Sequence, residues 1–267
     1  MLHARTLLLM LPTALAFLAL PTIAGRHETG FLNRFVRVNG TEYRYQVYVP
    51  SNWSKKQKWP VILFLHGAGE RGDDGLVQTE IGIGTAIRRH QDRFPAIVVM
   101  PQCREKVWWL DASMEAQALK ALDDARKEFK GDPARVYLTG LSMGGYATWD
   151  LGAKATGRFA ALVPICGGVV LPSHVTGREP GMPPTEATGD PYAATARSIG
   201  KTPVWAFHGS DDPAVPVTES RSLAEALKAA GGNVRYTEYP GVGHHSWENA
   251  YAEPDLMPWL LAQRLGK

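Results

Sequence analysis

The chain has 267 residues, of which 45% are hydrophobic and 21% are charged, and its formal net charge is +3. This composition can bury a large core, and it fits one large α/β domain better than two small ones. The charge is modest and no basic block stands out, so the composition gives no indication of a nucleic-acid partner.

The N-terminus has the pattern of a secretory signal peptide. A short positive start precedes an apolar stretch over residues 6–20, and the small residues Thr22 and Ala24 then suit a cleavage site. The alternative is an uncleaved membrane anchor. Because Pro12 interrupts the stretch, which is shorter than the ~20 residues of a spanning helix, cleavage is favoured. We predict a signal peptide over residues 1–24, cleavage after about Ala24 and a periplasmic or secreted protein.

A β-hairpin is predicted next. Apolar and polar residues alternate over residues 31–38 and 42–49, and Asn39-Gly40 between them is typical of a tight turn. Residues 61–65 form a continuous apolar run, which suits a central parallel strand covered on both faces.

Strands and helices then alternate. Further strands are predicted over residues 96–100, 135–140, 161–165, 204–207 and 234–239. Helices are predicted over residues 81–90, 113–130, 218–230 and 255–264, and after Ser142. The second helix is expected to be capped by Ser113 and ended by Gly131. This order predicts a doubly wound, mostly parallel sheet with an antiparallel edge.

Residues 171–192 are rich in proline and glycine and should form no regular element. They join two strands whose ends should line a site, so the segment is either a substrate-facing loop or a plain surface excursion. It is too short for a helical lid domain, which predicts an open site.

The two cysteines, Cys103 and Cys166, each follow a predicted strand. In an oxidising compartment they could form one disulfide. Those strands are not neighbours in the inferred sheet, so two buried free thiols are expected.

Ser142 lies between Gly140 and Gly144, on a predicted strand-to-helix turn. A nucleophile on such a turn has a strained backbone, and side chains two residues away on either side would collide. The turn therefore exposes the Ser142 hydroxyl and directs the N–H of Met143, at a helix N-terminus, toward the same space. That N–H can stabilise an oxyanion.

Three other strand ends carry residues that could complete this site. Ala68, in His66-Gly67-Ala68-Gly69, is the expected second oxyanion donor, with His66 in a structural role. After residues 204–207, Asp211 or Asp212 could orient an imidazole. After residues 234–239, His244 or His245 could remove the serine proton. The alternative role of Asp211 is capping or solvation.

These motifs resemble the α/β-hydrolase superfamily, which uses the order Ser…Asp…His. The chain is similar to the carboxylesterase and phospholipase branch of serine esterases, and also to secreted feruloyl-esterase and polyhydroxybutyrate-depolymerase-like proteins. The most specific matches are residues 65–72 and 243–247. The family pattern His-Gly-x-x-Asp-Pro-x-Val-Pro implies Asp212 as the acid, and Gly-His-x-Ser implies His244 as the base. His245 departs from the relatives, many of which have asparagine or serine there.

The resemblance implies an α/β-hydrolase fold over residues 25–267, with an N-terminal antiparallel hairpin and no large lid domain. It implies cleavage of small-molecule or polymeric carboxylic esters through an acyl-enzyme on Ser142, with no metal or cofactor. Trp108, Trp109 and Trp247 could line a substrate pocket or be packing residues. The alternatives are a serine peptidase of prolyl-oligopeptidase type and a binding protein on an inactivated hydrolase fold.

Overall fold

The structure is a computed structural model that describes residues 28–173, 175, 178–186 and 188–266; the predicted signal peptide lies outside them. These residues form one 8-stranded sheet in the order β1-β2-β4-β3-β5-β6-β7-β8. The strands are β1 (Gly30–Val38), β2 (Thr41–Val49), β3 (Trp59–Leu65), β4 (Ile97–Pro101), β5 (Gly131–Leu141), β6 (Ala161–Ile165), β7 (Val204–Gly209) and β8 (Val234–Tyr239). Among the described helices, none combines the length and apolar character that crossing a membrane requires.

The first two strands form the predicted hairpin. β1 pairs with β2 in antiparallel register. Asn39 and Gly40 make the turn with φ of 50° and 82°, and positive φ at both positions suits the twist of the flanking strands. β2 is also antiparallel to β4, whereas all later pairings are parallel. The sheet is therefore mostly parallel with an antiparallel edge, as predicted.

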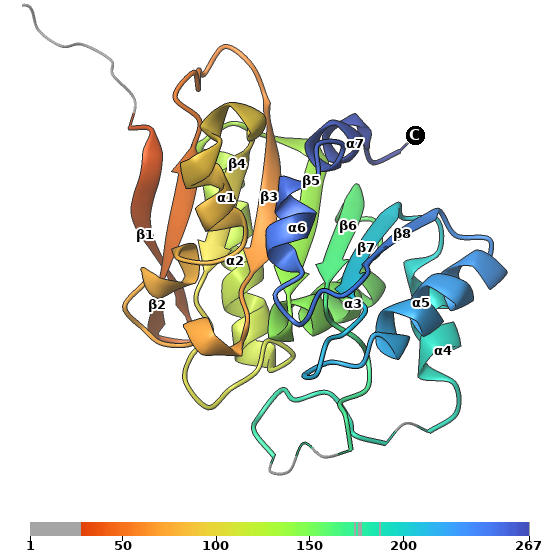
Figure 1. Ribbon diagram of the computed structural model, residues 1–267. Helices are drawn as coiled ribbons and strands as arrows, with labels where there is room; N and C mark the ends of the chain where they lie inside the picture. Colours follow the sequence, from red (N-terminus) through yellow and green to blue (C-terminus); the bar gives the residue numbers. More distant parts are fainter. Residues whose placement is uncertain (1–27, 174, 176–177, 187, 267) are drawn as a thin grey trace, which may run out of the picture.

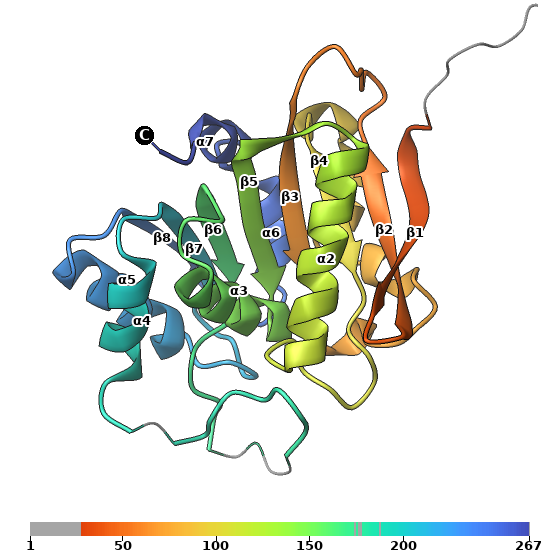
Figure 2. The same cartoon turned by 180° about the vertical axis from the view of Figure 1, so that it is seen from behind.

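Helices cover both faces of the sheet (Figures 1 and 2). One face carries α2 (Ala112–Glu128), α3 (Met143–Lys154), α4 (Pro191–Ile199) and α5 (Thr218–Ala229). The other carries α1 (Ile83–Arg89), α6 (Trp247–Ala252) and α7 (Leu256–Ala262). All 7 residues of β3 are buried, because a parallel strand between two helical layers meets no water on either side.

Helix α2 follows the predicted apolar pattern but begins and ends differently. Its inward face is buried at Met114, Ala118, Leu122 and Ala125. The N-cap is Asp111 rather than Ser113, and the Asp111 side chain accepts a hydrogen bond from the Ser113 backbone N–H. A carboxylate at a helix N-terminus is favoured by both the free N–H groups and the dipole. Gly131, expected only to end the helix, already begins β5 and pairs with Trp59 of β3.

Two helices depart from the prediction. Helix α4 begins at Pro191, inside the segment expected to be irregular throughout. Proline is tolerated there because the first helical N–H needs no partner, and the Asp190 side chain caps the turn by accepting from the Ala193 N–H. Helix α6, directly after the His244 loop, was not expected. Within the described residues no helical lid domain is inserted, in agreement with the predicted fold.

Both cysteines are free and buried, as predicted. Cys103 follows β4 and Cys166 follows β6, and β3 and β5 lie between those strands. Burial raises the pKa of Cys103 to about 12, and burial also raises the pKa of Cys166. Both thiols are therefore protonated at neutral pH and are poor nucleophiles.

The parallel strands all end at the same edge of the sheet, and the loops that follow them meet there. These loops carry Ala68 after β3, Ser142 after β5, Asp212 after β7 and His244 after β8.

Candidate active site

Ser142 occupies the sharp turn between β5 and α3. Its backbone has φ of 52° and ψ of −118°, a conformation that non-glycine residues rarely adopt. A Cβ on Gly140 would collide with the Gly144 carbonyl, and one on Gly144 would collide with the Leu65 carbonyl. Both glycines are therefore required for the close approach of the turn to the neighbouring backbone. The Ser142 N–H donates to the Ile165 carbonyl at 3.0 Å, which ties the turn to β6.

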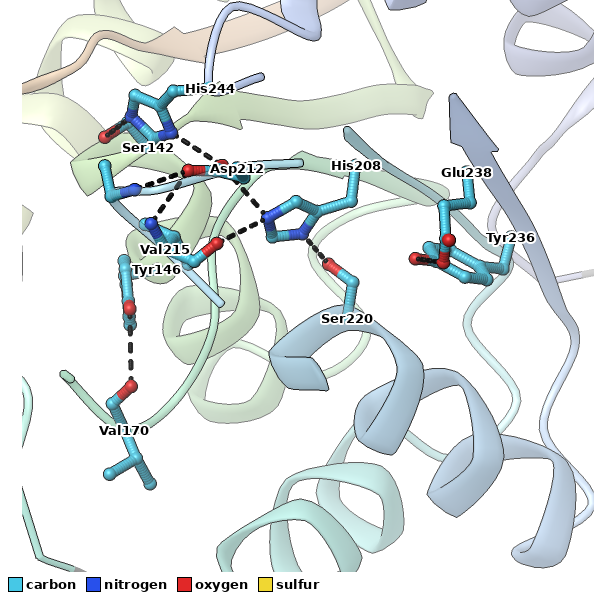
Figure 3. A network of polar contacts seen from close by, with 11 residues as sticks. Ser142, Tyr146, Val170, His208, Asp212, Val215, Ser220, Tyr236, Glu238 and His244 are labelled. Carbon is cyan, nitrogen blue, oxygen red and sulfur yellow. Dashed lines mark hydrogen bonds and ion pairs between the residues drawn. The ribbon is translucent and has the colours of Figure 1, made fainter. Parts of the chain in front are cut away.

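His244 and Asp212 lie beside this serine (Figure 3). His244 Nε2 lies 2.9 Å from Ser142 Oγ, and His244 Nδ1 lies 2.7 Å from Asp212 Oδ2. In the sequence, His244 is 102 positions from Ser142 and 32 positions from Asp212. They form a continuous line from hydroxyl through imidazole to carboxylate, which is the geometry of a serine-hydrolase triad.

Asp212 has a fully buried side chain whose two oxygens are both hydrogen-bonded. Oδ1 accepts from the backbone N–H groups of Ala214 and Val215 at 2.8 and 2.9 Å. Oδ2 faces His244 and also His208, whose Nε2 lies 3.1 Å away. Burial raises the pKa of Asp212, but the hydrogen bonds from His208, His244 and the Val215 N–H outweigh burial and leave the pKa below its ordinary value. The carboxyl is therefore ionised at neutral pH.

The neighbouring candidates point elsewhere. Asp211 is exposed, and its Oδ1 accepts from the Ser210 hydroxyl at 2.6 Å. His245 is exposed and lies against Trp247, with ring centroids 4.7 Å apart. The structure thus brings Ser142, Asp212 and His244 together and leaves Asp211 and His245 outside the line.

The two expected oxyanion donors flank Ser142. Met143 is the first residue of α3, at the helix N-terminus. Ala68 begins a single 3-10 turn, Ala68–Glu70, after β3, and a Cβ on the preceding Gly67 would lie 3.7 Å from Ser142 Cβ. Both backbone segments are therefore close to the serine, which fits a role in binding an oxyanion.

His66 holds the loop after β3 to the loop after β4. It is fully buried; its Nε2 accepts from the Cys103 N–H at 2.9 Å, and its Nδ1 lies 2.6 Å from the Gly67 carbonyl. Burial lowers the pKa of His66 to about 4. A neutral imidazole with both nitrogens bonded to backbone has the structural role that the sequence predicts.

The three tryptophans proposed as substrate contacts occupy different environments. Trp109 is only 1% exposed, and its Nε1 donates to the His66 carbonyl at 3.0 Å. It belongs to the core, and we do not retain it as a substrate contact. Trp247 is 6% exposed and packs edge-on against His244, with ring centroids 5.4 Å apart. Trp108 is half-buried and lies edge-on to Tyr146, so of the three it has the most exposed surface, and a substrate contact by Trp108 or Trp247 stays a prediction.

The proline-rich loop before α4 is fastened to the site by Glu179. Glu179 Oε2 accepts from Arg71 Nη1 at 2.6 Å and from Trp108 Nε1 at 2.9 Å. Arg71 Nε donates in turn to the Ala68 carbonyl at 3.0 Å. No sequence motif contains residues 71, 108 and 179 together, so the sequence does not predict that they meet. The contacts favour a site-facing loop over a plain surface excursion.

Among the described residues, Cys166, Asp212 and His244 are grouped closely enough to hold a metal ion, with ligand atoms within 4.8 Å of one another. The Asp212 carboxylate and the His244 imidazole are already bonded to each other. Burial raises the pKa of the Cys166 thiol, and a protonated thiol is a poor metal ligand. The group is therefore better explained by the hydrogen-bonded line of Ser142, His244 and Asp212 and the packing beside it.

Among known proteins, the chain is similar to several that are named as esterases or thioesterases. Acyl-protein thioesterase 1 of Gibberella zeae is 30% identical over 112 residues, which are 42% of each chain. The bifunctional acetylxylan esterase/xylanase XynS20E of Neocallimastix patriciarum is 29% identical over 139 residues, which are 51% of this chain and 20% of that protein. The chain thus spans less than half the length of these curated relatives.

A crystal structure of a thermostable esterase superposes with a TM-score of 0.70 at 34% identity, covering 88% of this chain and 63% of the other. The model of the prolyl oligopeptidase family matches residues 114–262, more than half of the chain, from α2 through the serine turn, Asp212 and His244 to α7. With its eight-stranded α/β-hydrolase sheet, the chain belongs to the prolyl oligopeptidase family.

Proposed function

We propose that the protein hydrolyses carboxylic esters through an acyl-enzyme on Ser142. The observation that carries this proposal is the position of His244, whose two ring nitrogens lie 2.9 Å from Ser142 Oγ and 2.7 Å from Asp212 Oδ2. An ionised carboxylate only accepts hydrogen bonds, so Nδ1 carries the proton and Nε2 is free to accept one. His244 is therefore poised as a base toward the serine hydroxyl.

The reaction follows from this arrangement. Ser142 Oγ attacks the ester carbonyl carbon while its proton moves to His244 Nε2, and the Asp212 carboxylate stabilises the resulting imidazolium. The N–H groups of Ala68 and Met143 are assigned to the negative oxygen of the tetrahedral intermediate. His244 then gives the proton to the departing alcohol. Water, deprotonated by the same imidazole, releases the acid and restores Ser142.

Ester hydrolysis is favoured over peptide hydrolysis by the relatives. The family takes its name from a peptidase, but two similar proteins are named as a thioesterase and an acetylxylan esterase, and a similar structure is named as an esterase. We assign the substrate to small-molecule or polymeric esters, and we assign the protein to the periplasm or the exterior on the pattern of residues 1–24.

The test is a screen of the purified protein with p-nitrophenyl esters from acetate to palmitate, methyl ferulate and matched p-nitroanilides. We expect ester cleavage in the wild type, much slower anilide cleavage, and a loss of roughly 10³-fold or more in Ser142→Ala. A fluorophosphonate probe should label the wild type at Ser142 and leave Ser142→Ala unlabelled. Full esterase activity in Ser142→Ala would refute the mechanism. A wild type that is neither active nor labelled would favour a binding protein on an inactivated fold.

A further inference from the structure

His208 is a second imidazole on the Asp212 carboxylate. It lies in β7 with no exposed surface, and its Nε2 is 3.1 Å from Asp212 Oδ2 and 3.1 Å from the Val215 carbonyl oxygen. Its Nδ1 is 2.7 Å from Ser220 Oγ in α5. Figure 3 shows His208 and His244 approaching Asp212 from different directions.

The protonation of His208 follows from these partners. The carboxylate of Asp212 and the carbonyl of Val215 can only accept hydrogen bonds, so Nε2 must carry a hydrogen that points toward them. Nδ1 lies within hydrogen-bonding distance of the Ser220 hydroxyl, which can donate to the ring or accept from it. The Ser220 side chain is 1% exposed, so no bulk water competes for this contact. Ser220 thereby holds the ring in the orientation that presents the Nε2 hydrogen to Asp212.

This contact completes the anchoring of the carboxylate. Two backbone N–H groups, of Ala214 and Val215, hold Oδ1. Oδ2 is shared between the N–H groups of His244 and His208. Without His208, only the moving catalytic imidazole would fix Oδ2, and the carboxylate could turn about its Cβ–Cγ bond.

We propose that His208 and Ser220 form a positioning pair that fixes the orientation of Asp212 and moderates its interaction with His244. The inference rests on the hydrolytic function proposed above. A donor shared on Oδ2 draws part of the carboxylate's charge away from His244, so the pair sets how strongly Asp212 favours the imidazolium over the neutral base.

The other groups near Asp212 and His208 do not replace this contact. Glu238 of β8 is close enough for His208 to influence its pKa, but its carboxylate is held by Arg221 at 2.6 and 2.8 Å. Cys166 after β6 and Tyr146 of α3 both feel the Asp212 charge, and burial raises the pKa of each. Both stay neutral at the pH of an assay, so neither adds a charge beside the contact between His208 and Asp212.

The test compares His208→Leu, His208→Gln and Ser220→Ala with the wild type. Leucine removes the donor, whereas the glutamine amide can place an N–H near the position of Nε2. Rates on a p-nitrophenyl ester are followed against pH at the isosbestic wavelength of the product, and each is divided by the active-site concentration from fluorophosphonate titration.

We expect kcat per labelled site to fall roughly 10- to 100-fold in His208→Leu, because the carboxylate then keeps its productive orientation on His244 for only part of the time. The acid limb of the pH profile of kcat/KM should shift to higher pH by about half a unit or more. Oδ2 then interacts with His244 alone and stabilises its imidazolium more strongly. His208→Gln should recover most of both effects. Ser220→Ala should show smaller changes in the same directions.

A rate per site and an acid limb that are unchanged in His208→Leu would overturn the inference, since a purely structural role alters only the amount of active protein. If His208→Leu does not fold, Ser220→Ala decides, and an unshifted limb there overturns it. A fall in rate without any limb shift would also contradict the shared-donor account. A wild type without Ser142-dependent activity or labelling would instead remove the proposed function on which the inference stands.

Discussion

Two adjacent aspartates after β7 differ completely in their surroundings. Asp212 accepts four hydrogen bonds in a buried position, two from backbone N–H groups and two from imidazoles. Asp211, one residue earlier, is exposed and bonded to the Ser210 hydroxyl. A carboxylate can stabilise an imidazolium strongly only where water is excluded and its orientation is fixed.

This contrast gives a matched pair of variants. We expect Asp212→Asn to lower kcat on a p-nitrophenyl ester by roughly 10³- to 10⁴-fold, because an amide cannot hold His244 in the needed tautomer. Asp211→Asn should stay within about twofold of the wild type, since it changes only a solvated group. The measurement is kcat and KM for both, with circular dichroism to compare folding. Equal losses in the two variants would contradict the assignment of the acid.

At the scale of elements, the proline-rich loop before α4 is held to the loop after β3 by one carboxylate. Glu179 Oε2 receives both the Arg71 guanidinium and the Trp108 indole N–H, and Arg71 also binds the Ala68 carbonyl. The Trp108 backbone N–H adds a bond to the Pro180 carbonyl at 2.8 Å. The loop, the tryptophan and the proposed oxyanion donor Ala68 are thus fastened together.

Removing that carboxylate should loosen the site without unfolding the protein. We expect Glu179→Ala to reduce kcat/KM roughly 5- to 30-fold, because Ala68 and Trp108 lose their shared support, and to speed proteolytic cleavage within residues 171–190. Glu179→Gln should be intermediate, since its amide oxygen can still accept from Trp108. Glu186→Ala, which removes an exposed carboxylate on the same loop, is the control. Unchanged kinetics and proteolysis in Glu179→Ala would show that the contact is incidental.

At the scale of the whole molecule, buried or paired carboxylates join segments that are distant in sequence. Asp132 at the start of β5 accepts from Arg135 at 2.8 Å and from Arg264, beyond α7, at 3.2 Å. Burial raises the pKa of Asp132, but the two arginines and the Ala134 N–H outweigh burial and leave that pKa below its ordinary value. Glu238 of β8 pairs with Arg221 of α5, and the hydrogen bonds from this guanidinium, together with the one from the Tyr236 hydroxyl, lower the pKa of Glu238 from 4.5 to about 2.

Because these carboxyl groups have lowered pKa values in the folded protein, its stability depends on pH. As the pH falls, the unfolded carboxyl of Glu238 takes up a proton near 4.5 and the folded one only near 2, so stabilisation present above 4.5 is lost across that interval. We expect the wild-type Tm to fall as the pH drops from about 5 toward 3. The Tm of Glu238→Gln should fall slightly less steeply, with a difference of at most about 2 °C, because Arg221 is exposed and Glu238 is only partly buried, so solvent screens the pair. Thermal melts at several pH values would check this, and a steeper fall in the variant would contradict it.

Local sequence patterns were enough to predict the features that depend on them. Alternation and apolar runs placed the hairpin and the central strands, because a strand buried on one or both faces constrains each residue along it. The glycines around Ser142 identified the nucleophile turn, because that backbone conformation excludes other side chains at Gly140 and Gly144. The order of motifs along the chain then indicated the fold class.

Contacts between side chains that are distant in sequence became visible only in the folded chain. The fold brought His244 and Asp212, the residues that the family pattern implies, into one line with Ser142. It also placed Trp109 in the core, began α4 at a proline, and joined Glu179 to Arg71 and His208 to Asp212. These outcomes depend on where the side chains after distant strands point once the sheet has formed. Two adjacent loop residues, such as Asp211 and Asp212, can face solvent and the site respectively. The apolar periodicity of the sequence does not show which of the two faces the site.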